Sequence, residues 1–197
     1  MSWLKSVTRR LSTPVTPATS YHDAPDLEAT LPSTVAARQM VRWSVARDNF
    51  WDVLGGNRAR SELTPELESV GAAPSDIEMA VAGRADSAHD PPYIVWALQF
   101  GSLTGSDLWG PVPSSIAMDV MHVNVNRGEN WRDATLGGKK VLIGNRSMID
   151  QNRHQHGMPY VWITKSAIYA LITDDESWAE EVVKGHDSRG GSPALRG

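Results

Sequence analysis

The chain has 197 residues, of which 41% are hydrophobic and 21% charged, close to the composition of an ordinary globular protein. Its net charge of -4 argues against a general nucleic-acid binder, because such proteins need a basic face to displace counterions from phosphates. The absence of cysteine excludes disulfides, thiolate nucleophiles, cysteine zinc sites and iron–sulfur clusters. Since no secretory leader or membrane-spanning apolar run is recognisable, the sequence predicts a cytoplasmic protein.

Residues 1–38 are expected to precede the folded domain. The apolar residues of positions 1–12 recur at helical spacing: Trp3, Leu4, Val7 and Leu11. Three basic residues lie mostly on the opposite side: Lys5, Arg9 and Arg10. This pattern is typical of a basic amphipathic helix that docks on a protein partner or makes peripheral contact with an anionic membrane; a frayed terminus, or packing on its own domain, is the alternative. Residues 12–20 form a Pro/Thr-rich linker, and residues 21–36 are expected to hold little regular structure.

Residues 39–184 are predicted to form one domain. Its first strand is Met40–Ala46, where Val41, Trp43 and Val45 alternate with polar Arg42 and Ser44. A helix capped by Asp48 should follow and stop at a pair of glycines, Gly55 and Gly56.

A second helix is expected over Ser61–Val70, with Pro65 tolerated only near its first turn and Gly71 ending it. Alternation from Ile77 to Val81 and the apolar run Pro92–Phe100 then predict a hairpin.

The stretch 105–126 is ambiguous. Pro111 and Pro113 should break its first part, and Ser114 could cap a helix through Met121. Ile116, Met118 and Val120 also fit a two-residue period, so a strand is the alternative.

Two further hairpins and a helix complete the domain. Gly137-Gly138 supplies the positive φ angles that a tight turn needs between Trp131–Leu136 and Lys139–Ile143. A second hairpin joins Pro159–Lys165 to Ala167–Thr173. Asp174 or Asp175 should then cap a helix that ends at Lys184, whose acidic residues are explained by the helix dipole and by solubility.

These elements predict an α+β fold: an antiparallel sheet of six or seven strands with helices mainly on one face. The tail, residues 185–197, is expected to be disordered. The phrases Pro92–Leu98 and Pro159–Ile163 resemble each other, which raises the hypothesis of a tandem repeat of two half-domains.

The loop 144–158 carries the residues best suited to bind a metal. In an extended segment His154 and His156 project to the same side, and Asp150 could add a carboxylate ligand, with His122 as a further one. A solvated polar loop, or a loop that contacts a partner, explains the same residues.

The chain contains eight tryptophans, and most of them fall in predicted strands and helices, where core packing explains them. Trp109 and Trp131 instead lie near glycine-, proline- or charge-rich stretches. We therefore expect these two to be partly exposed at an interface.

The sequence thus favours a non-enzymatic protein-interaction or accessory subunit of a larger assembly, which docks through its termini and exposed tryptophans. Its expected partner is another protein or a second copy of itself, with no nucleic acid and no cofactor. The alternative is a metal-dependent enzyme or small-ligand binder with its site near residues 144–158.

Overall fold

The structure is a computed structural model that describes residues 21–35, 38–54, 56–84, 94–101, 103–120, 131–145 and 157–185. Its strands are β1 (Thr34–Val35), β2 (Arg38–Ala46), β3 (Ile77–Arg84), β4 (Ile94–Phe100), β5 (Trp131–Leu136), β6 (Lys139–Gly144), β7 (Met158–Ile163) and β8 (Ala167–Thr173). Its helices are α2 (Pro25–Thr30), α3 (Arg47–Leu54), α4 (Gly56–Ser69), α5 (Pro111–Val120) and α6 (Glu176–Gly185), with 3-10 turns η1 (Pro74–Asp76) and η2 (Gly105–Trp109).

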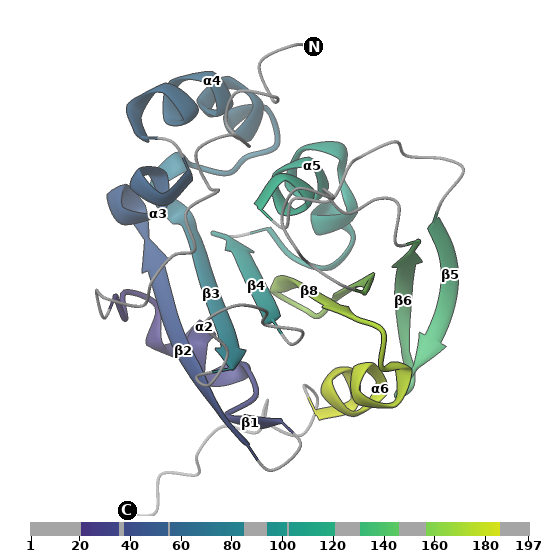
Figure 1. The fold of residues 1–197 in the computed structure, drawn as a ribbon. Helices are drawn as coiled ribbons and strands as arrows, with labels where there is room; N and C mark the ends of the chain where they lie inside the picture. The colour runs from purple at the N-terminus through teal and green to yellow at the C-terminus, as the bar shows by residue number, and fades with distance from the viewer. Residues whose placement is uncertain are drawn as a thin grey trace, which may run out of the picture.

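All the strands join one antiparallel sheet in the order β1-β2-β3-β4-β8-β7-β6-β5. The predicted α+β fold is therefore confirmed, with the two-residue β1 added at one edge. Two groups of sequential strands, β2–β4 and β5–β8, meet where β4 pairs with β8, Ile94 opposite Ile172 and Leu98 opposite Ile168. The strand direction turns steadily across the sheet, so that β8 lies crosswise between β4 and β6 in Figure 1.

Side chains alternate between the two faces of the sheet, and both faces are apolar near its centre. The first face is the one to which Trp96, Leu98 and Phe100 of β4 point. The helices α3, α4 and α5 pack in the same cluster through these buried residues: Phe50, Trp51, Leu54, Ala59, Leu63, Leu67, Ile116, Ala117, Met118 and Val120. Three of the five described helices thus cover the first face.

The second face is built from small residues under α2. Ala80, Ala82 and Ala97 are fully buried there, together with Leu27 and Leu31 of the helix. Because alanine leaves room above the strands, the two leucines can lie close to the sheet and fill that space.

The helix α6 covers the other half of the second face with four buried side chains: Trp178, Ala179, Val182 and Val183. Between α2 and α6, Trp162 stacks on Tyr169 with ring centroids 5.5 Å apart. The Tyr169 hydroxyl donates a hydrogen bond to Thr30 Oγ1 at 3.0 Å, which ties α2 to the far half of the sheet. None of the described helices is both long and apolar enough to span a bilayer.

The expectation of little regular structure over residues 21–36 was wrong. Residues 21–31, here called the N-terminal strap, contain α2 and lie against the sheet, where Ala24, Leu27 and Leu31 join the core. A helix of six residues has little stability by itself, so its formation depends on this packing. Pro25 read as a linker residue, but it occupies the first helical turn, where its missing N–H costs nothing.

Two helices that contain proline begin at other residues than the sequence predicted. The helix α4 begins at Gly56 rather than Ser61, which places Pro65 inside it. Pro111 begins α5, so Pro111 and Pro113 lie in its first turn instead of breaking it, and Ser114 is internal. The strand alternative for this stretch was wrong.

The two similar phrases occupy different places in the sheet. The first contributes Ile94–Leu98 to β4 at the centre, followed by η2 and α5, whereas the second contributes Pro159–Ile163 to β7, followed directly by β8. The duplication therefore remains a hypothesis.

Both ends of α6 are fixed by side chains. Asp175 Oδ1 accepts a hydrogen bond from the backbone N–H of Trp178 at 3.0 Å, so Asp175 is the N-cap, as predicted. At the other end Lys139 Nζ donates to the Val183 carbonyl at 2.7 Å. The tight turn at Gly137 and Gly138, with φ of 56° and 85°, brings Lys139 to that position.

Two buried tyrosines on the second face provide a matched test of this packing. Among the described residues the Tyr160 hydroxyl has no hydrogen-bond partner, whereas the Tyr169 hydroxyl bonds to Thr30. Tyr160→Phe should leave the free energy of unfolding unchanged or raise it by up to about 1 kcal/mol, and Tyr169→Phe should lower it by about 0.5–1.5 kcal/mol. Urea denaturation measures both, and an equal loss in the two variants would contradict the assignment.

The N-cap predicts a pH dependence of stability. Hydrogen bonds from Ser177 and from the Trp178 N–H lower the pKa of Asp175. Because the folded-state pKa is below the unfolded value of about 3.9, the stabilisation is present above that pH and is lost as the pH falls through the folded-state pKa.

Asp175→Ala should therefore lower the free energy of unfolding by about 1 kcal/mol at pH 7. Asp175→Asn, which keeps an acceptor, should cost less at pH 7 and approach the wild type in acid. Urea denaturation at pH 7 and at pH 3 measures the free energy of unfolding of both proteins. If the wild type and Asp175→Asn differ by the same amount at the two pH values, the charge of the carboxylate does not contribute.

Candidate functional site

Trp109 is exposed at the end of the η2 turn, which a hydrogen bond fixes to the rest of the fold. It ends η2, and 37% of its surface is accessible, while its neighbour Leu108 is fully buried. The Gly105 N–H donates to the Lys165 carbonyl at 3.0 Å, which fixes the turn to the loop between β7 and β8. A large indole held in this way loses little conformational freedom on binding.

Trp131 begins the edge strand β5 and is half-buried. It packs against the core of the first face, as do the half-buried side chains of Leu142 on β6 and Ile163 on β7. This part of the first face therefore retains accessible apolar surface.

The two tryptophans do not form one continuous site. Trp131 pairs with Gly144, near the start of β7, whereas η2 is bonded just beyond the end of β7 at Lys165. At about 3.3 Å per strand residue, the length of β7 separates them by roughly 20 Å. They are therefore separate candidate contacts on the first face.

The strand β5 lies at the end of the strand order, and within the described residues only β6 pairs with it. Its outer backbone groups can pair with another extended segment. Arg132, Asp133 and Thr135 are exposed along it, and Asp133 pairs with Lys140 at 3.2 Å. Charged side chains of this kind limit non-specific pairing at a sheet edge.

The solvent side of α6 is strongly acidic. Glu176, Glu180 and Glu181 are exposed there, and Lys184 is the helix's basic residue. Burial raises the pKa of the Tyr160 hydroxyl beneath the helix, and the negative charge of Glu176 raises it further. The first turn of α6 thus places negative charge near Tyr160 of β7.

At the β2 end of the sheet, a polar network joins an exposed histidine to a buried glutamate and a buried serine. Glu28 Oε2 lies 2.8 Å from His22 Nδ1 and accepts a hydrogen bond from Ser44 Oγ at 3.1 Å. The Ala24 N–H donates to Ser44 Oγ at 2.9 Å. Ser44 is fully buried, and its hydroxyl bonds to the carboxylate rather than to the imidazole. The network fastens the N-terminal strap to β2.

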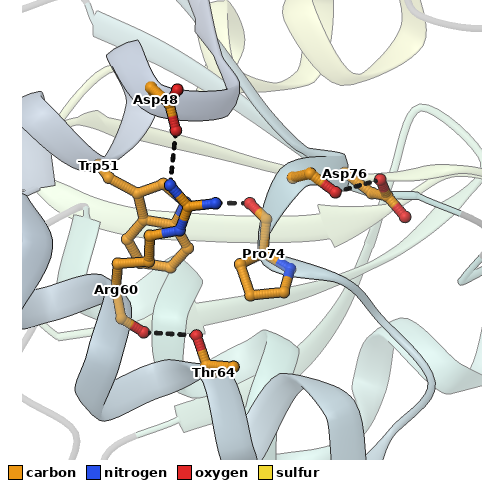
Figure 2. Close-up of polar contacts among 7 residues, drawn as sticks. Asp48, Trp51, Arg60, Thr64, Pro74 and Asp76 are labelled. Carbon is orange, nitrogen blue, oxygen red and sulfur yellow. Dashed lines mark hydrogen bonds and ion pairs between the residues drawn. The ribbon is translucent and has the colours of Figure 1, made fainter.

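A second polar group, at the corner of α3, α4 and η1, is also structural (Figure 2). Asp48 Oδ1 pairs with Arg60 at 2.6 Å, so it links two helices instead of capping α3, which begins at Arg47. Trp51 Nε1 donates to the Pro74 carbonyl at 3.0 Å and anchors η1.

Several predicted site residues lie outside the described ranges. They are the metal-ligand candidates His154, His156 and Asp150, the further ligand His122, and the interface residues Trp3, Leu4, Val7 and Leu11. Among the residues that are described, no group of three or more His, Asp or Glu is arranged to hold a metal ion. The metal site in the loop 144–158 and the docking site in residues 1–12 therefore remain predictions from the sequence.

The strap network is the arrangement that sequence reasoning missed. Ser44 alternates with apolar residues on β2 and was expected to face solvent, but the strap covers that face. Glu28 lies 16 positions away in a segment taken for a linker. The backbone bridge between His22 and Ser44, which are 22 positions apart in the chain, brings His22, Glu28 and Ser44 together.

No protein family, no curated protein and no solved structure matches this chain significantly. The function must therefore be argued from its own residues.

The strap network predicts a large effect at one buried serine. Ser44→Ala removes the acceptor of the Ala24 N–H and a donor to Glu28, and should lower the free energy of unfolding by about 1–3 kcal/mol. The control is Ser75→Ala, which deletes an exposed bond to Asp76 and should cost less than about 0.5 kcal/mol. Equal costs in urea denaturation would mean that the buried network adds nothing to stability.

Proposed function

We propose that the protein is a non-enzymatic interaction or accessory subunit of a larger assembly, which binds a protein partner through Trp109. The observation that carries this proposal is the exposed indole on the fixed η2 turn. Tryptophan is among the residues that contribute most to protein interfaces, because it offers a large apolar area and one N–H donor.

The surroundings of Trp109 fit this role. Exposed Asp107 lies two residues before it, and the exposed ring of Pro111 two residues after it. An apolar centre with polar neighbours is the usual composition of a binding hot spot and its rim. Half-buried Trp131, with Leu142 and Ile163, offers a second apolar contact on the same face.

The cytoplasm is the compartment we propose. The chain contains no cysteine, so its folding needs no oxidising environment.

The experiment compares two exposed aromatic residues. Tyr21 is 39% exposed and lies beside β2, on the other side of the sheet from β5, so Tyr21→Ala is the matched control for Trp109→Ala. Partners that co-purify with the full chain are identified by mass spectrometry, and their affinities for each variant are measured by calorimetry. Trp109→Ala should weaken binding by about 30-fold or more, the effect of losing a hot-spot residue, with little change for Tyr21→Ala. Unchanged partners and affinities in Trp109→Ala would refute the proposal.

A further inference from the structure

The helix α6 contacts the turn that follows β5, the strand whose outer edge pairs with no other described strand. Gly137, in the turn between β5 and β6, lies so close to Lys184 that a Cβ at Gly137 would be 2.9 Å from the Lys184 Cβ. The bond from Lys139 Nζ to the Val183 carbonyl holds the same contact. The C-terminal end of the helix is therefore fixed to the turn between β5 and β6, and its exposed glutamates lie on the preceding turns of the same helix.

These carboxylates are available to a basic partner. Within the described part of the chain, Glu176, Glu180 and Glu181 form no ion pair. Exposed Asp174 precedes them, which adds negative charge at the start of the helix.

A segment of opposite charge occurs at the start of the chain. Residues 1–12 carry Lys5, Arg9 and Arg10, and the first acidic residue of the chain is Asp23. The same segment contains apolar residues that could cover accessible apolar surface: Trp3, Leu4, Val7 and Leu11. Its charge therefore complements that of Glu176, Glu180 and Glu181 on α6, which with the neighbouring end of β5 are here called the α6–β5 surface.

We infer that residues 1–12 of one copy of the chain bind the α6–β5 surface of a second copy. This inference rests on the proposed interaction function, of which it names one partner. Lys5, Arg9 and Arg10, which helical spacing places mostly on one side of the segment, then face the glutamates of α6.

A second copy is the favoured donor because of where the described chain begins. The Tyr21 carbonyl accepts a hydrogen bond from the Ser44 N–H of β2, and five strands separate β2 from β5 in the sheet. The described chain therefore begins at one side of the sheet, and the proposed acceptor lies at the other.

Symmetric pairing of two β5 edges is less favourable. It would place two acidic α6 helices beside each other, and their like charges would repel. A contact between different surfaces avoids this repulsion and links copies head to tail into a ring or a chain.

Self-association of the full chain tests the inference. Light scattering after size-exclusion chromatography should show a mass that rises above 21.5 kDa with concentration and returns to it in 1 M salt, where the screening length is about 3 Å. The triple variant Glu176→Lys, Glu180→Lys, Glu181→Lys should weaken association by at least about tenfold, as should Lys5→Glu, Arg9→Glu, Arg10→Glu. Mixing the two charge-reversed variants should restore it.

Two controls separate this contact from other causes. The matched variant Asp52→Lys, Glu66→Lys, Glu68→Lys reverses three exposed acids of α3 and α4 and should leave association unchanged. Trp109→Ala should also leave it unchanged, so that this inference and the proposed function can fail separately. The reversal in residues 1–12 lies outside the described fold and tests the inference even if the α6 variant does not fold.

Three results would overturn the inference. The first is a mass of one chain at every concentration, and the second is association that neither charge reversal weakens. The third is binding of the chain to vesicles of anionic phospholipid, abolished by the reversal in residues 1–12, without self-association, which would assign the segment to a membrane surface.

Discussion

The pairing of β4 with β8 is the contact on which the rest of the fold depends. It joins two groups of sequential strands through apolar partners on both faces, Trp96 opposite Ala170 on the first and Ala97 opposite Tyr169 on the second. Because these strands are far apart in the chain, the pairing carries a loop-closure cost that only the burial of both faces can offset. The helices supply that burial.

The two helical layers have different relations to the sheet. On the first face the helices α3, α4 and α5 pack against large side chains of the sheet. On the second face α2 packs against three alanines, Ala80, Ala82 and Ala97. The α2 contact buries few large groups, and the polar network of Glu28 and Ser44 fixes its position. A satisfied buried network of this kind specifies one arrangement where apolar contacts alone would allow several.

With both faces covered at the centre, the accessible features of the described chain lie at its periphery. They are the indole of Trp109 beyond the end of β7, the free edge of β5, and the acidic side of α6. Each is held by the fold but contributes little to it, which is the usual position of residues that serve binding.

The sequence by itself determined the fold class, the three hairpins, the final helix with a cap at Asp174 or Asp175, and the burial of four tryptophans, because these features follow from local periodicity, turn glycines and caps. It also singled out Trp109 as exposed. Only the tertiary structure decided that residues 21–31 belong to the core, that Ser44 is buried beside Glu28, and that α6 lies over the β5 side of the sheet. The physical reason is distance along the chain: a six-residue helix, a polar strand position and an acidic helix face are given their role by partners that no local pattern reveals.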